Sequence, residues 1–178
     1  RGLGDVYKRQ SEAIAEEEGI ELSSLCGKRE CFLFQVLKNG SLLIAGSDKR
    51  GTIYGLFHIS ELMGVSPFVH FADVVPAPQK EIIFSEKDSM QSKEPSVKYR
   101  GFFINDEWPA FGNWTFSHYG GFTAEMYDLI FETLLRLKGN YLWPAMWTSS
   151  FSLDGPGEEN ARLADCYGIV MSLSLIHI

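Results

Sequence analysis

The stretch Lys98–Glu107, KYRGFFINDE, decides how the second half of the chain is interpreted. Its aromatic and β-branched side chains up to Ile104 are typical of a buried strand. Three polar residues, Asn105, Asp106 and Glu107, follow immediately. The stretch therefore predicts a strand that ends at an amide and two carboxylates.

The same pattern recurs further along the chain, where the apolar run Tyr141–Trp147 (YLWPAMW) ends in an indole. An amphipathic helix is expected between the two strands at 124–137, and a shorter helix at 158–167 leads to a third strand at 168–171. Strands that alternate with helices form parallel sheets with right-handed crossovers. We therefore expect residues 96–171 to be the truncated start of a (β/α)8 barrel, whose site lies at the carboxyl ends of its strands.

The first half of the chain predicts a small α+β domain at 11–84. Two apolar runs flank Asn39-Gly40, a dipeptide preferred in tight hairpin turns. Ser47 or Asp48 is expected to cap a helix that runs to about Met63, with apolar residues such as Leu56 on one face. Further expected elements are a helix at 11–22, short strands at 68–71 and 81–84, a linker at 85–95, and a long loop at 108–122. The fold class is thus α/β, with a small α+β domain before a truncated barrel.

Composition excludes some classes of partner. The formal net charge of −7 lacks the basic footprint of nucleic-acid binding, and no apolar run reaches the ~18–20 residues of a membrane span. The aromatic fraction of 13% fits a carbohydrate-active protein or an aromatic core, and the three cysteines lack metal-ligand spacing. Residues 1–10 and 172–178 differ in character from the rest, and we expect them to be a non-native leader and tail.

Several motifs in a fixed order resemble one enzyme family. They are Gly64–Pro67, Glu94–Gly101, Phe103–Glu107, Leu134–Lys138 and Asn140–Trp147. Together they resemble glycoside hydrolase family 115, the xylan α-1,2-glucuronidases, over about residues 12–171.

The resemblance implies an inverting hydrolase that removes glucuronic acid or its 4-O-methyl form from xylan, without cofactor or metal. It implies a secreted or periplasmic protein acting on glucuronoxylan or derived oligosaccharides, and it leaves open a homodimer of the full-length protein. We expect the principal acid and base to lie outside this segment, which alone would be inactive. Two alternatives stay open: a related exo-glycosidase, hexosaminidase-like or family 67-like, and a non-catalytic carbohydrate-binding homologue.

The adjacent carboxylates Asp106 and Glu107 point in opposite directions in extended backbone, so at most one faces the barrel mouth. They cannot easily form the acid–base pair of one inverting site, whose carboxyl groups lie about 6.5–9.5 Å apart. We favour Asp106 in the pocket, as an auxiliary or orienting catalytic residue that also binds substrate. Glu107 is favoured as a salt-bridge or loop-anchoring residue and is also included in the binding set, with the roles of the two carboxylates open to exchange.

Five further residues are considered for binding, each with a structural alternative. Asn105 suits a hydrogen bond to a hydroxyl or a role in the turn. Trp143 and Trp147 suit stacking on sugar or packing against the next helix. His118 suits binding or a hydrogen bond within its loop. Arg100 could hold a uronate carboxylate, although an internal ion pair is favoured for it.

Overall fold

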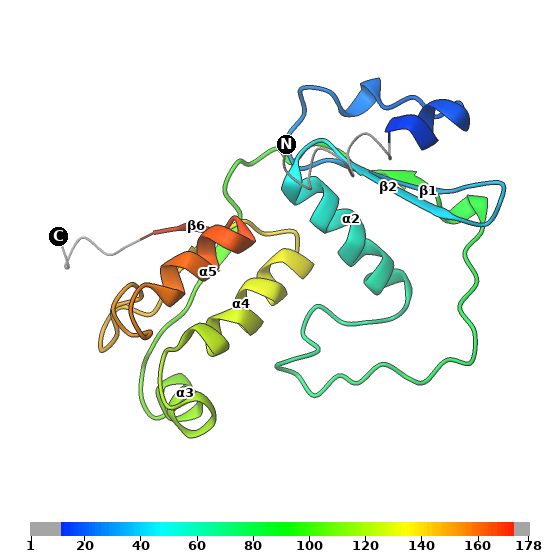
Figure 1. Ribbon diagram of the computed structural model, residues 1–178. Coiled ribbons are helices and arrows are strands. Elements are labelled where there is room, and N and C mark those ends of the chain that lie inside the picture. The colour runs from blue at the N-terminus through cyan, green and yellow to red at the C-terminus, as the bar shows by residue number, and fades with distance from the viewer. Residues whose placement is uncertain (1–11, 173–178) are drawn as a thin grey trace. The chain divides into compact units, whose positions relative to one another are not determined.

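The computed structural model describes residues 12–172, which form two compact units (Figure 1). Unit 1 comprises the residues up to Ser66 together with Val75–Ser96. Unit 2 comprises Pro67–Val74 together with the residues from Val97 onward. No helix within residues 12–172 combines the length and the apolar character needed to cross a bilayer.

Unit 1 is a three-stranded antiparallel sheet in the order β2-β1-β3 with a helix packed on it. Its elements are a helical stretch at 12–17, η1 (Ser23–Leu25), β1 (Phe32–Val36), β2 (Leu42–Gly46), α2 (Lys49–Leu62), η2 (Glu86–Asp88) and β3 (Met90–Gln91). The predicted hairpin is confirmed, because Phe32 pairs with Gly46 and Val36 with Leu42. Gly40 adopts a φ of 83° in the turn, a region that favours glycine.

Helix α2 begins as predicted, because the Asp48 carboxylate accepts the N–H of Gly51 at 2.8 Å. The face that packs on the sheet, however, carries Gly51 and Tyr54, whereas Leu56 is 54% exposed. A Cβ at Gly51 would lie 2.1 Å from the Cys31 carbonyl oxygen. The helix thus approaches the strand through its smallest residue, and the expected apolar stripe is not its buried face.

The segment 65–95 differs from prediction in three places. Residues 68–71 form turns, and residues 81–84 have no regular structure, so neither expected strand is present. The expected linker at 85–95 contains η2 and β3. Its serines bond to β1: the Ser92 hydroxyl accepts the N–H of Phe32 at 2.8 Å, and the Ser89 hydroxyl accepts that of Val36 at 2.9 Å. A polar stretch can therefore complete a sheet edge because its side chains supply acceptors.

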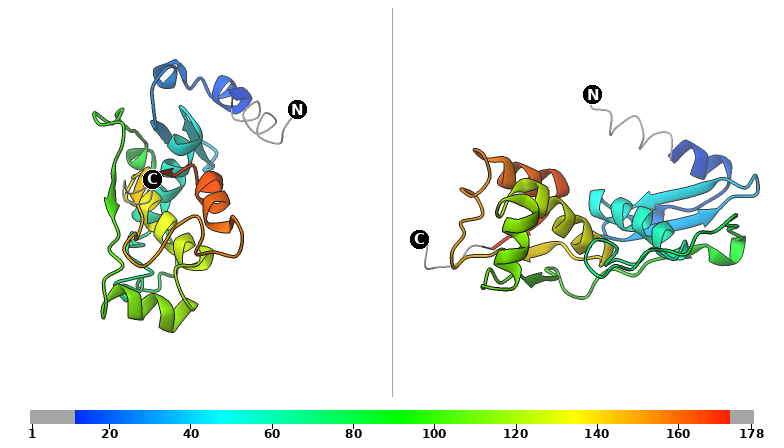
Figure 2. Two further views of the ribbon diagram at one scale, coloured as in Figure 1. Left: turned by 90° about the vertical axis from the view of Figure 1, so that its left-hand side faces the viewer. Right: turned by 90° about the horizontal axis from the view of Figure 1, so that it is seen from below.

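Unit 2 is a three-stranded parallel sheet in the order β4-β5-β6, as the alternation of strands and helices predicts. Its elements are β4 (Gly101–Phe103), α3 (Phe111–Tyr119), α4 (Ala124–Arg136), β5 (Tyr141–Trp143), α5 (Glu159–Tyr167) and β6 (Val170–Met171). Helices α4 and α5 pack together on one face of the sheet (Figure 2). The mixed α/β architecture is confirmed, with shorter strands than expected.

Helix α3 occupies the stretch that was expected to be a long loop. Its glycines suggested irregular structure, but they serve the helix in different ways. Gly120 ends α3 in the left-handed conformation at φ 72°. Gly112 lies inside α3 under the Trp108 indole, where a Cβ would lie 2.6 Å from Cε2 of that ring. The prediction of a loop is wrong because Gly112 is required by packing against Trp108 and not by a turn.

The core of unit 2 forms between α4 and the sheet. Tyr127, Phe131, Leu134 and Leu142 are at most 1% exposed, which confirms most of the predicted apolar stripe of α4. Phe151 packs edge-on against Tyr127 with ring centroids 4.8 Å apart. The loop after β5 therefore shares the core of the helix that precedes it.

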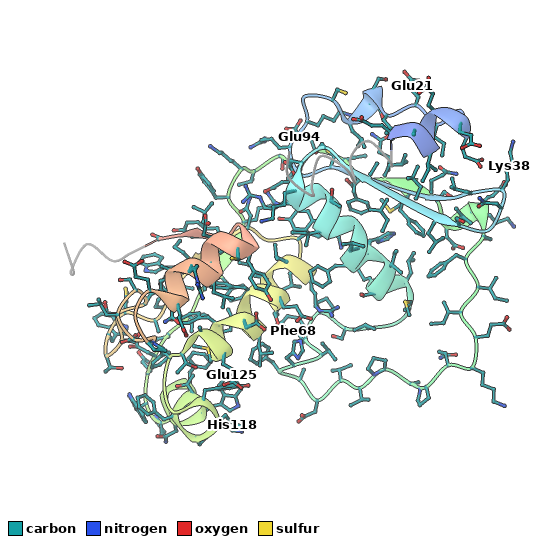
Figure 3. The ribbon with its side chains drawn as sticks, in the orientation of Figure 1. Glu21, Lys38, Phe68, Glu94, His118 and Glu125 are labelled. Carbon is teal, nitrogen blue, oxygen red and sulfur yellow. The ribbon has the colours of Figure 1, made fainter. Side chains whose placement is uncertain are left out.

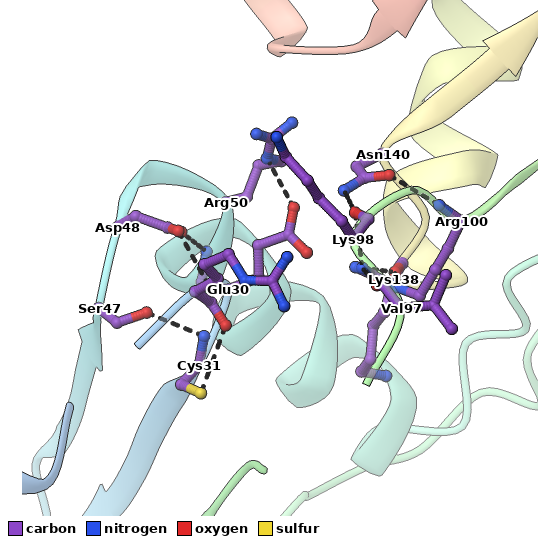
Figure 4. A network of polar contacts seen from close by, with 12 residues as sticks. Glu30, Cys31, Ser47, Asp48, Arg50, Val97, Lys98, Arg100, Lys138 and Asn140 are labelled. Carbon is purple, nitrogen blue, oxygen red and sulfur yellow. Dashed lines mark hydrogen bonds and ion pairs between the residues drawn. The ribbon is translucent and has the colours of Figure 1, made fainter. Parts of the chain in front are cut away.

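Polar contacts tie the amino ends of β4 and β5 together (Figure 4). The Arg100 guanidinium donates to the carbonyl oxygens of Lys138 and Val97, each at 2.9 Å. The buried Asn140 side chain accepts the N–H of Arg100 at 2.9 Å and donates to the Lys98 carbonyl oxygen at 2.8 Å. Arg100 thus binds backbone carbonyl groups at the amino end of β4. The polar residues Asn105–Glu107 follow the other end of that strand, so binding of a uronate by Arg100 is not favoured.

Candidate functional site

The carboxyl ends of β4 and β5 lie side by side. Phe103 pairs with Trp143, and the N–H of Ile104 donates to the Trp143 carbonyl oxygen at 2.9 Å. Because the strands are parallel, Asn105–Glu107 and the loop that follows β5 meet at one edge of the sheet. The structure thus brings together the two patterns that the sequence indicated.

Asp106 anchors the loop after β5. Its carboxylate accepts the backbone N–H groups of Trp147 at 3.0 Å, Thr148 at 2.5 Å and Ser149 at 3.1 Å, and the Thr148 hydroxyl donates to it at 3.0 Å. Burial acts to raise the pKa of Asp106, but the hydrogen bonds from Thr148 and Trp147 outweigh it and hold that pKa below its usual value. Asp106 is therefore an ionised loop anchor at neutral pH.

The two adjacent carboxylates, Asp106 and Glu107, differ in their exposure to solvent. Asp106 is 0% exposed, whereas Glu107 is exposed. The two carboxylates thus differ in exposure, and Asp106 holds the loop, which is the role favoured for Glu107. For Asp106 this geometry favours the orienting role over direct contact with substrate, and both roles stay predictions.

Asn105 is the other polar residue at the end of β4. It is partly buried, and its Oδ1 atom is enclosed without a hydrogen-bond partner among residues 12–172. A buried amide oxygen that accepts no hydrogen bond is costly. This oxygen is a candidate acceptor for a substrate hydroxyl, as predicted for Asn105.

Aromatic rings lie beside the polar strand end. Trp143 is 39% exposed and meets Phe103, which is 43% exposed, with ring centroids 5.3 Å apart. The neighbouring Leu142 is fully buried, so alternation places Trp143 on the opposite face of the sheet. Trp147 is 60% exposed on the loop that Asp106 holds. Both tryptophans therefore present the accessible aromatic surface that stacking on sugar requires.

His118 lies on the exposed last turn of α3 (Figure 3). Its Nδ1 atom is 2.8 Å from the Trp114 carbonyl oxygen and 2.9 Å from the Ser117 hydroxyl. These contacts are local to α3 and do not reach the strand ends. They correspond to the structural alternative for His118, and its role in binding stays a prediction.

Sequence reasoning missed how the loop after β5 is held. Asp154 accepts the N–H of Ser150 at 2.6 Å, and burial, with repulsion from Asp106, raises the Asp154 pKa. Tyr127, buried close by, has a pKa well above its usual value because of burial and both carboxylates. The run of hydroxyl residues after Trp147 was the available signal, since such residues often terminate strands in side-chain-bonded turns.

Metal binding by the described residues is a separate question. In the part of the chain that the structure describes, no three histidine, cysteine, aspartate or glutamate side chains cluster as metal ligands. The candidate site thus consists of amide, carboxylate and aromatic groups.

Comparison with known proteins identifies the family. Residues 92–177 match the model of glycosyl hydrolase family 115. The solved structure of BtGH115A, described as a family GH115 4-O-methyl-α-glucuronidase with specificity for decorated arabinogalactans, is similar at 39% identity and a TM-score of 0.78. The match covers 89% of this chain and 22% of that one, and none of the curated proteins compared with the chain matches it. On these two matches, the chain belongs to glycosyl hydrolase family 115.

Proposed function

We propose that the protein carrying this chain is an α-glucuronidase that removes glucuronic acid or 4-O-methylglucuronic acid from a polysaccharide. The observation that carries the proposal is the similarity, over 89% of this chain, to a 4-O-methyl-α-glucuronidase. The exposed indoles of Trp143 and Trp147 beside the amide of Asn105 support it, because sugars are bound by aromatic faces and a few placed polar groups.

The proposed mechanism is hydrolysis with inversion in a (β/α)8 barrel, of which β4, β5 and β6 would be the first strands. Inversion needs a carboxylic acid that protonates the leaving oxygen and a carboxylate that activates water. Asp106 is enclosed by loop donors, so we assign it the placement of the loop that carries Trp147. The principal acid and base are then residues outside this chain. A secreted or periplasmic location and a homodimer of the full-length protein belong to the same proposal.

Two substrates are proposed. The resemblance of the motifs favours glucuronoxylan, whereas the similar solved enzyme has specificity for decorated arabinogalactans. Incubation of the full-length protein with each polysaccharide, followed by quantification of free uronic acid, distinguishes them. We expect release from at least one of the two.

Other outcomes of this assay identify the alternatives. Activity on hexosaminides without release of uronic acid would indicate a related exo-glycosidase. Binding to polysaccharide without any hydrolysis would indicate a carbohydrate-binding homologue. Proton NMR of the first product formed tests the mechanism: inversion of an α-linkage yields the β-anomer first, and initial formation of the α-anomer would contradict it.

A further inference from the structure

We propose that Trp108 and Phe116 form an aromatic platform that binds a neutral sugar ring of the polysaccharide main chain, next to the decorated sugar. This inference rests on the proposed function. Trp108 is 49% exposed and Phe116 is 50% exposed. Their ring centroids lie 5.4 Å apart, with the planes inclined at 44°. The two rings therefore present one continuous apolar surface. Its residues are distant in the sequence from Trp143 and Trp147.

The platform is supported from beneath. The Trp108 indole lies against the backbone of α3 at Gly112, where a Cβ would be 2.6 Å from the ring. Phe116 packs edge-on against the buried Phe122, with centroids 6.2 Å apart. Side chains held in this way lose little conformational freedom when a ligand binds, so less of the binding energy is lost to ordering.

The position of the platform suits the main chain of a polysaccharide. Trp108 follows Glu107 directly, so it lies in the segment that leaves the carboxyl end of β4, the edge that carries the candidate site. An enzyme that removes a side group must also hold the chain to which that group is attached. Pyranose rings present C–H faces that stack on indole and phenyl faces.

Neither ring of the platform carries a charge. Indole and phenyl faces contact the C–H groups of a sugar and offer no cation to a carboxylate. The platform therefore favours a neutral main-chain pyranose over a second uronic acid.

Kinetics on long and short substrates test this assignment in the full-length protein. The variants are Trp108→Leu, which keeps apolar volume over Gly112, and Phe116→Ala. The control is Phe68→Ala, because Phe68 is similarly exposed at 46% and is not one of the two platform residues. We expect KM for the polysaccharide to rise about tenfold in the two variants and to stay unchanged in the control. For a disaccharide of the uronic acid and the one sugar that bears it, which has no further main-chain ring, kcat/KM should stay unchanged in all three.

The outcomes separate this inference from the proposed function. An unchanged KM for the polysaccharide in both platform variants would overturn the inference, as would an equal loss on both substrates. If the unaltered protein releases no uronic acid, the proposed function fails, and affinity electrophoresis in polysaccharide gels then decides the platform. If the polysaccharide slows the migration of Phe68→Ala but no longer slows that of Trp108→Leu, the platform is supported. If it slows both variants equally, the platform is refuted. Thermal unfolding of each variant shows whether the fold is retained.

Discussion

Among single residues, Asp106 has the best defined role, because one buried carboxylate collects the N–H groups of three successive residues. In Asp106→Asn the amide nitrogen would face donors such as the Thr148 N–H. We expect the free energy of unfolding to fall by roughly 1.5–3 kcal/mol, the range for hydrogen bonds to a charged group. Urea denaturation measures this loss. The matched control is Glu107→Gln on the exposed neighbour, where a change above about 0.5 kcal/mol would count against the assignment.

The ionisation of Asp106 also predicts a dependence of stability on pH. The pKa of Asp106 is depressed in the folded protein, so its contribution to stability is present above the unfolded value of about 4. The contribution is lost as pH falls from there through the folded pKa. The melting temperature should therefore decline less steeply below about pH 4 in Asp106→Asn than in the unaltered protein. If the melting temperatures of the two proteins decline equally steeply below about pH 4, another group is responsible for the loss of stability in acid.

At the scale of elements, the amino ends of β4 and β5 depend on Asn140. It is 2% exposed and bridges the Arg100 N–H and the Lys98 carbonyl oxygen. Asn140→Ala leaves both backbone groups without this partner, and we expect a loss of roughly 2–3 kcal/mol in unfolding free energy. Asn113→Ala, at an exposed position of α3, is the control and should change stability little or raise it slightly. Equal effects of the two substitutions would refute the bridging role.

Elements with a strong local signal were predictable. The Asn39-Gly40 turn, the Asp48 cap and the apolar stripe of α4 each follow from local backbone or side-chain chemistry. Strand β3 was not predictable, because two residues have no periodicity and their strand forms only by pairing with β1. Helix α3 was missed because Gly112 has a packing role that no local rule reveals.

For the whole molecule, the segments of the two units alternate along the chain, because each unit is built from two separate stretches. Residues Val75 and Ile83, 83% and 76% exposed, mark the irregular segment between Pro67–Val74 and β3. We expect trypsin to cut native full-length protein after the exposed Lys80 before it cuts after Lys138, whose carbonyl oxygen is held by Arg100. Mass spectrometry of timed samples identifies the order.

The nicked protein should stay together, because β1 and β3 lie on opposite sides of the cut and pair with each other. Within unit 2, His70 and Glu132 also link stretches on opposite sides of the cut, with Nε2 and Oε1 3.1 Å apart. Size-exclusion chromatography of the nicked sample should show the elution volume of the intact protein. Separation into two fragments would contradict the interleaved arrangement.

The sequence by itself determined the parallel order of β4, β5 and β6 and the division of Asp106 from Glu107, because both follow from the alternation of elements and of side chains along a strand. Only the tertiary structure decided which of these carboxylates is enclosed. Period-2 alternation shows that neighbours face opposite ways, but it does not show on which side donors will gather. That depends on the loop after β5, whose N–H groups converge on Asp106 once the strands have paired.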